Sequence, residues 1–182
     1  MITEEKTIDS ERIYDGVIID LRRDLVITRG GRTSWREIVE HNGGVAIAAL
    51  TGEGKMVIVK QYRKAAEQVV LEVPAGKIEK GEEHAVAARR ELLEETGYSA
   101  ERMEHLMAFY ASIGFCTEVI HLYMATGLTP GETCFDDNED IEVLEYGLEE
   151  LLVMVNKGDI IDAKTIIAIQ TAVLSYSDIL KC

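Results

Sequence analysis

The stretch that decides the fold runs from Gly76 to Gly97 and reads GKIEKGEEHAVAARRELLEETG. Within it, small and apolar residues such as Ala88 and Leu92 recur three to five positions apart, which is the spacing of one buried helix face. Gly97 follows the last of these residues and supplies a common C-terminal stop of a helix. The pattern therefore predicts a helix over residues 83–96.

Three carboxylates on this predicted helix carry its chemistry. Glu91, Glu94 and Glu95 stand at positions i, i+3 and i+4, so their side chains leave the same side of the helix. Like charges at this spacing, near the negative end of the helix dipole, destabilise the helix unless a cation compensates them. Carboxylates without a neighbouring Cys or His select hard cations, with Mg²⁺ first and Mn²⁺ as a substitute. The alternative interpretation is a solvated acidic face that pairs with Lys or Arg.

The complete spacing narrows this choice. From Gly76 to Gly97 the residues follow the pattern G-x5-E-x7-R-E-L-x-E-E-x-G, which resembles the Nudix box of hydrolases that act on nucleoside diphosphates linked to another moiety. Tyr98 departs from the pattern, because the family usually has an aliphatic residue there. The resemblance implies an α/β fold, namely an α/β/α sandwich with a mixed β-sheet.

The resemblance also implies a role for each charged residue of the box. The implied metal ligands are three carboxylates and one backbone carbonyl, those of Glu91, Glu94, Glu95 and Ala75. Arg90 and Glu82 match the positions that orient these carboxylates through a salt bridge, because metal ligands must be held in place. We expect Glu94 and Glu95 to lie at the surface of the helix and not in the core.

The remaining chain predicts strands and helices in mixed order. Residues 11–38 alternate short apolar runs with turn residues, which predicts a small β-meander. Further strands are predicted at 45–50, 56–59, 69–73, 106–111, 119–125 and 141–146, and further helices at 148–156 and 163–180. We therefore expect a β-rich N-terminal segment, residues 1–42, followed by a hydrolase domain, residues 43–182.

Four segments outside the box resemble one subfamily, the ADP-ribose pyrophosphatases. They read WREIVEH at 35–41, KQYR at 60–63, LEVPAG at 71–76 and DAKT at 162–165. Members of that subfamily use Mg²⁺ to cut ADP-ribose into AMP and ribose 5-phosphate. The resemblance implies that Arg63 approaches the substrate diphosphate.

The same resemblance implies a substrate site that two subunits share. Arg36 and Glu37 match residues that contact the adenine across a subunit boundary, so we expect a homodimer that exchanges its N-terminal strands. The surroundings of Gly114 also fit a substrate-binding loop of the subfamily. Ile113 stands where many ADP-ribose enzymes have a proline, which leaves another nucleoside diphosphate sugar, a dinucleotide or an oxidised nucleotide open as substrate.

An acidic loop at 135–142 is the expected source of the general base. Attack on a diphosphate needs a water that has lost its proton, and relatives use a carboxylate from a loop at this place. Glu139 is the first choice and Asp137 the second, and if neither acts, a box glutamate such as Glu94 remains.

Composition sets the limits for partners and location. The chain has 182 residues and 33 Asp and Glu against 19 Lys and Arg, a formal net charge of −14. Such a charge repels nucleic acids and anionic membranes, and a small anionic substrate needs local arginines or a cation. The three cysteines without a CxxC pair and the polar N-terminus predict a reduced, cytoplasmic protein. A module that senses ADP-ribose without cutting it is the non-enzymatic alternative.

Overall fold

The computed structural model describes residues 2–131 and 140–179. The chain divides into two compact units. The first unit combines the chain up to Gly43 with Tyr110–Val119, and the second combines Gly44–Phe109 with the chain from Ile120 onward. The segment Tyr110–Val119, which the sequence analysis assigned to the hydrolase domain, thus groups with the N-terminal strands.

Ten strands and three helices make up the described residues. The strands are β1 (Lys6–Asp15), β2 (Asp20–Ile27), β3 (Thr33–Glu40), β4 (Gly44–Ala49), β5 (Lys55–Arg63), β6 (Gln68–Glu72), β7 (Ala75–Lys77), β8 (Tyr98–Tyr110), β9 (Val119–Pro130) and β10 (Ile141–Gly147). The helices are α1 (His84–Thr96), α2 (Leu148–Lys157) and α3 (Ala163–Ile179).

The first unit is an antiparallel meander in the order β1-β2-β3. The predicted meander is present, but it begins at Lys6 and not at residue 11. The sequence did not predict this start because β1 is exposed along its whole length and shows no apolar pattern at its beginning. The segment Tyr110–Val119 joins this sheet at β3. There the N–H of Val39 donates to the carbonyl oxygen of Phe115 at 2.8 Å, and the N–H of Thr117 donates to the carbonyl oxygen of Val39 at 2.9 Å.

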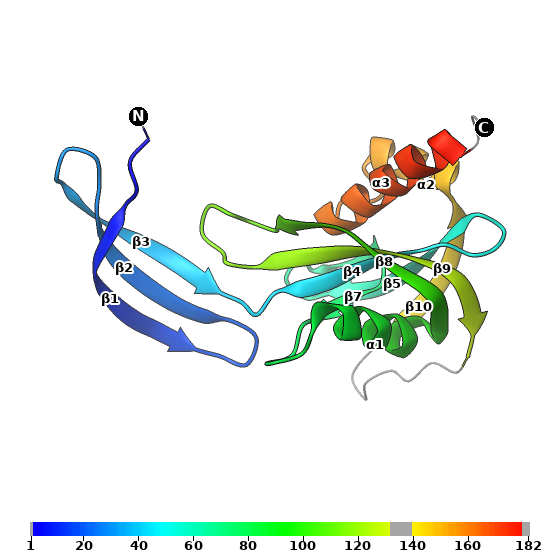
Figure 1. The fold of residues 1–182 in the computed structure, drawn as a ribbon, viewed down its shortest axis with the longest axis horizontal. Coiled ribbons are helices and arrows are strands. Elements are labelled where there is room, and N and C mark those ends of the chain that lie inside the picture. The colour runs from blue at the N-terminus through cyan, green and yellow to red at the C-terminus, as the bar shows by residue number, and fades with distance from the viewer. Residues whose placement is uncertain (1, 132–139, 180–182) are drawn as a thin grey trace. The chain divides into compact units, whose positions relative to one another are not determined.

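The second unit contains a mixed sheet in the order β7-β4-β9-β8 and a smaller sheet in the order β10-β5-β6. Strand β4 runs parallel to β9 and antiparallel to β7, which confirms the mixed sheet. The alternating side chains of β4 separate two hydrophobic layers. Val45 and Ile47 pack with residues of α1, whereas Ala46 and Ala48 pack with residues of α2 and α3. Figure 1 shows α1 on one side of these strands and α2 and α3 on the other, so the α/β/α sandwich is confirmed.

The helix predicted from the box is confirmed, and its end is well defined. Gly97 adopts a left-handed conformation with φ of 73°, and its N–H donates to the carbonyl oxygen of Leu93 at 2.8 Å. Strand β8 begins directly after this glycine, whereas the sequence predicted a strand only from residue 106. The first half of β8 is mostly polar and exposed, so it lacks the apolar alternation by which strands are recognised.

Candidate active site

Two of the three carboxylates on α1 lie on the side of the helix that faces the protein. Residues four apart share one stripe of a helix, so Glu91 and Glu95 continue the buried row that starts at Ala87. Glu91 is 9% exposed and Glu95 is 5% exposed. The expectation that Glu95 lies at the surface is therefore wrong. Glu94 stands at the edge of this row and keeps 41% of its side chain exposed.

Gly76 is needed because the backbone of β7 passes directly against Glu91. A Cβ added at position 76 would lie 2.0 Å from Cδ of Glu91. A larger residue at position 76 would therefore displace the carboxylate of Glu91 from its place against the strand. The first glycine of the box thus allows a carboxylate to stand against a strand.

Arg90 gathers three carboxylates around one guanidinium, and we call Glu82, Arg90, Glu91 and Glu94 the Arg90 cluster. Nε and Nη2 of Arg90 donate to the two carboxylate oxygens of Glu82, both at 3.0 Å. Nη1 donates to Oε1 of Glu91 at 2.7 Å and to Oε2 of Glu94 at 2.9 Å. Hydrogen bonds from Arg90 and from the N–H of Glu79 lower the pKa of Glu82, and the hydrogen bond to Glu82 raises that of Arg90. The orienting role that the resemblance implied for Arg90 and Glu82 is consistent with these contacts.

The backbone holds the remaining carboxylate of the box. The N–H of Ala75 donates to Oε2 of Glu95 at 2.9 Å, and this hydrogen bond is buried. Ala75 opens β7, which pairs with β4 at Ala46, so the position of its amide is set by the sheet. Glu95 is thereby fixed between the helix and the strand.

The donor set fits a hard divalent cation in its chemistry. The Arg90 cluster places three carboxylates against one guanidinium, so negative charge exceeds positive charge, and all ligating atoms are oxygens. Within residues 2–131 and 140–179, no three or more His, Cys, Asp or Glu side chains lie in positions from which they could bind one metal ion together. The carboxylates are instead held by Arg90 and Ala75.

Arg63 lies at the end of β5 and takes part in a second ionic group, which we call the Glu72 cluster: Arg63, Glu72, Asp162 and Lys164. Nε and Nη2 of Arg63 donate to the two oxygens of Glu72 at 2.6 and 2.9 Å. The hydrogen bond to Glu72 raises the pKa of Arg63, burial opposes this, and the charges of Glu95 and Asp162 add to the increase. The charge of Glu95 therefore acts on Arg63, which links the Glu72 cluster to the box.

Arg36, Glu37 and Gly114 belong to the first unit. Nε and Nη2 of Arg36 donate to the carboxylate of Glu5 at 2.8 and 2.6 Å, and Nη1 donates to Oγ of Ser34 at 2.9 Å. Glu37 is exposed on β3, and Gly114 lies in an exposed turn after β8. Their roles in substrate binding stay predictions, and so do those of Glu139 and Asp137, which lie outside the described residues.

Sequence reasoning missed a cluster of histidines and assigned no function to any of them. The rings of His84 and His121 stack with centroids 4.1 Å apart, and Nδ1 of His121 lies 3.3 Å from Nε2 of His105. Nδ1 of His84 is also in hydrogen-bond contact with the hydroxyl group of Tyr123. These residues come from α1, β8 and β9, and their wide spacing in the sequence gave no signal for the contact.

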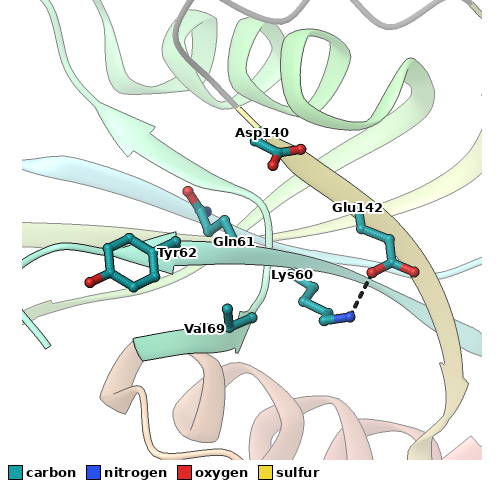
Figure 2. Close-up of a pocket in the computed structure, with 6 residues that line it drawn as sticks. All are labelled: Lys60, Gln61, Tyr62, Val69, Asp140 and Glu142. Carbon is teal, nitrogen blue, oxygen red and sulfur yellow. Dashed lines mark hydrogen bonds and ion pairs between the residues drawn. The ribbon is translucent and has the colours of Figure 1, made fainter. Parts of the chain in front are cut away.

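Two of the pockets in the described part of the second unit are lined by charged residues. One of about 350 Å³ is lined by the Glu72 cluster together with Ala65, Ala66, Val70 and Ile161. The other, of about 220 Å³, is lined by Lys60, Gln61, Tyr62, Val69, Asp140 and Glu142, and in it Nζ of Lys60 donates to Glu142 at 2.7 Å (Figure 2). The second pocket is lined by Asp140 and Glu142 of the acidic loop and by three residues of the segment KQYR, whereas the first contains Arg63.

A helix that carries carboxylates and packs against the mixed sheet of an α/β/α sandwich is the arrangement that the resemblance to the Nudix box implies. Residues 40–168 match the family model of the NUDIX domain. The chain belongs to the Nudix family and is a Nudix hydrolase. Hydrolases of this family generally need a divalent metal, which agrees with the chemistry of the box carboxylates.

The chain resembles two bacillar proteins along most of its length. It is 48% identical over 169 residues to the methanol dehydrogenase activator of Bacillus methanolicus, with 92% of this chain and 91% of that protein covered. It is 47% identical over 169 residues to the ADP-ribose pyrophosphatase of Bacillus subtilis (strain 168), with the same shares, 92% and 91%. A crystal structure of an ADP compounds hydrolase has the same fold, with a TM-score of 0.84 at 18% identity, covering 97% of this chain and 95% of that one.

No helix in the described ranges combines the length and the hydrophobicity that crossing a lipid bilayer requires.

Proposed function

We propose that this protein hydrolyses the diphosphate of ADP-ribose to AMP and ribose 5-phosphate, with Mg²⁺ as its metal. The observation that carries the proposal is the group of carboxylates on α1, two of which, Glu91 and Glu94, share the guanidinium of Arg90. Arg63 supplies a second guanidinium, which lines a pocket of about 350 Å³ and keeps 44% of its side chain exposed. A diphosphate that enters a protein of net charge −14 needs both a divalent cation and a guanidinium. The name of the relative from Bacillus subtilis supports ADP-ribose as the compound.

In this mechanism the carboxylates of Glu91, Glu94 and Glu95 and the carbonyl of Ala75 would hold the metal. When bound, the metal supplies charge neutralisation at the diphosphate and a lowered pKa of the attacking water. Arg90 keeps Glu91 and Glu94 together through its shared Nη1. Arg63 binds the diphosphate with the edge of its guanidinium that Glu72 does not engage.

The proton of the attacking water would pass to a carboxylate of the acidic loop, with Glu139 first and Asp137 second. Replacing Glu139 by Gln is expected to lower kcat while metal and substrate binding stay unchanged, because only proton removal is affected. Asp137→Asn is the matched comparison. Full rate in the Glu139 variant together with a loss in the Asp137 variant would move the base two residues upstream.

The adenine would be bound by Arg36 and Glu37 of the first unit, with the turn at Gly114 beside the substrate, in a homodimer. The first unit leaves several aliphatic side chains in solvent, with Val17 at 96% and Ile18 at 65% exposure, and a sheet this small is marginal without further burial. Sedimentation of the full chain is expected to give a dimer, and Val17→Asp with Ile18→Asp is expected to weaken it. A full-length monomer with full activity contradicts the shared site.

The test of the substrate is product analysis in ¹⁸O water on a panel of ADP-ribose, other nucleoside diphosphate sugars, dinucleotides and oxidised nucleotides. We expect the highest kcat/KM for ADP-ribose, and label in AMP or in ribose 5-phosphate identifies the phosphorus that is attacked. A higher kcat/KM for another sugar nucleotide would contradict ADP-ribose as the substrate. It would point to the loop that carries Ile113 in place of proline as the source of the changed preference. Binding of ADP-ribose without cleavage would instead favour a sensing module.

A second candidate function rests on the 48% identity to the activator from Bacillus methanolicus. Under this candidate the protein acts on a methanol dehydrogenase. Addition of the protein to a purified methanol dehydrogenase with Mg²⁺ tests it, with Glu94→Gln as the comparison. Stimulation by the wild type and not by the variant would show that both functions use the box.

A further inference from the structure

We propose that Lys164 is a positioning residue for substrate binding: it holds Glu72, and Glu72 in turn holds Arg63 in the orientation that meets the diphosphate. This inference rests on the proposed function, because it takes Arg63 as the residue that contacts the substrate. It gives a role to the segment DAKT at 162–165, which the chemistry of the box does not use.

Glu72 is the centre of the arrangement. Its side chain is only 3% exposed, and it lies in contact with two cations, Arg63 from β5 and Lys164 from α3. Burial by itself would raise the pKa of Glu72, but the hydrogen bond from Arg63 and the charge of Lys164 bring that pKa below its usual value. Glu72 is therefore a buried anion that depends on both cations.

Among the described residues, Arg63 is held along one edge of its guanidinium. Glu72 receives Nε and Nη2, and Nη1 lies on the opposite edge of the planar guanidinium. Arg63 keeps 44% of its side chain exposed and lines the pocket of about 350 Å³. A bidentate partner on one edge fixes the plane of the group, so the other edge meets a ligand with less loss of conformational freedom.

Lys164 is itself fixed by the start of α3. Its Nζ lies 3.0 Å from Oδ2 of Asp162 and donates also to Oε2 of Glu72. Asp162 accepts hydrogen bonds from the N–H and the hydroxyl group of Thr165, at 3.0 and 2.6 Å. That hydroxyl group accepts the N–H of Val73 at 2.9 Å. The residue after Glu72 is thus tied to the helix that carries Lys164.

The two oxygens of Glu72 explain why the lysine affects the arginine. Oε2 accepts hydrogen bonds from both Arg63 and Lys164, whereas Oε1 accepts one from Arg63 alone among the residues that the structure describes. When Lys164 is removed, only Arg63 still fixes the carboxylate, and the pair gains freedom to turn together. Arg63 then loses its fixed orientation toward the pocket, although its charge and its partner remain.

The experiment compares Lys164→Met with wild type in the presence of Mg²⁺. We expect KM for ADP-ribose to rise about tenfold, the effect of roughly one charged hydrogen bond, with kcat within about twofold. Lys164→Arg keeps a cation that reaches the same oxygens, so it is expected to restore most of the loss. Lys55→Met is the matched control, because Lys55 pairs with the exposed Glu53 at the opposite end of β5 and should leave KM unchanged.

A double-mutant cycle separates positioning from a structural role. Because Lys164 acts through Arg63, Lys164→Met is expected to leave KM unchanged in a chain that already carries Arg63→Ala. The same rise in KM in both backgrounds, or a fall in kcat with constant KM, overturns the proposal. If Lys164→Met melts below the assay temperature, Lys164→Gln replaces it in the cycle. Failure of the wild type to cut ADP-ribose would reject the proposed function alone, and the cycle would then use the panel substrate with the highest kcat/KM.

Discussion

The two ionic clusters of the second unit have opposite designs. In the Arg90 cluster a single guanidinium contacts three carboxylates, two of which belong to the helix that resembles a metal-binding element. In the Glu72 cluster a single buried carboxylate contacts two cations, and Asp162 balances the charge. The first has negative charge in excess and the second is balanced.

The difference indicates what each cluster is built to do. An excess of carboxylates favours the arrival of a further cation, because each carboxylate repels its neighbours until the charge is matched. A balanced, buried group gains little from a further ion, but it fixes the geometry of its members. We therefore propose that Glu91 and Glu94 of the Arg90 cluster take part in cation binding and that the Glu72 cluster orients Arg63.

The largest effect is expected when the excess charge is removed. Glu94→Gln and Glu95→Gln each delete a charged oxygen ligand, and the amide oxygen at position 95 still accepts the N–H of Ala75. Turnover with Mg²⁺ should fall on the order of 10³-fold, since the metal supplies several kcal/mol at the transition state. Glu104→Gln, which removes the partner of Arg102 on β8, is the control and should keep full rate. Rates near wild type at saturating Mg²⁺ in both box variants contradict the assignment.

A smaller effect is expected when the organising cation of the same cluster is changed. Arg90→Lys keeps the positive charge but loses the planar group that spans three carboxylates. The Mg²⁺ concentration for half-maximal rate should rise by roughly 10- to 100-fold, with recovery of kcat at high Mg²⁺. Arg89→Lys is the neighbouring control, because Arg89 donates only to the carbonyl oxygen of Ala100 among the contacts described for it. Equal Mg²⁺ dependence of the two variants would show that Arg90 does not organise the site.

The Glu72 cluster should respond in stability more than in metal dependence. Thr165 is fully buried, and Thr165→Val leaves the N–H of Val73 and an oxygen of Asp162 without this partner. The variant should lose roughly 1–3 kcal/mol of unfolding free energy, measured by urea denaturation, while the Mg²⁺ dependence stays as in wild type. The exposed Thr33→Val is the control for the loss of a hydroxyl group. A shift in Mg²⁺ dependence by Thr165→Val would show that the two clusters are coupled.

The smallest effect is expected at the histidine cluster, which serves neither ionic cluster. Burial and the charges of His84 and His105 lower the pKa of His121. The unfolded chain therefore binds a proton more readily, so stability should fall as the pH drops below about 6.5, the ordinary value for histidine. Melting temperatures of the metal-free protein between about pH 8 and about pH 5 test this, and His121→Gln should flatten the slope. An unchanged slope in the variant would exclude His121 as the titrating group.

The helix of the box could be predicted because its signals are local. Ala88 and Leu92 give the buried face, Gly97 ends the helix, and the positions of Glu91 and Glu95 follow from helical spacing. The burial of Glu95 could not be predicted in this way, since it depends on β7 crossing the helix at Ala75 and Gly76. The short strand β7 shows no periodicity of its own.

Contacts between distant residues were beyond sequence reasoning for the same reason. Lys164 and Glu72 lie far apart in the chain and meet only because α3 starts beside the end of β6. His84 and His121 meet only because β9 returns next to α1. The role of Arg63 in the site was expected from its resemblance to a known motif, but its ion pair with the buried Glu72 was not. An ion pair between separate strands or helices follows no fixed spacing in the sequence.

The hydrogen bond from Ala75 to Glu95 has a consequence for how this site tolerates mutation. The donor is a main-chain amide, so every residue type except proline supplies it at position 75. The anchor of this carboxylate is therefore encoded by the path of the backbone and not by the identity of a side chain. A substitution at position 75 leaves the anchor in place when the new side chain fits the buried site that Ala75 occupies in the core. Two immediate determinants of the backbone path are Pro74, which follows the preceding strand, and Gly76, which lets the chain pass Glu91.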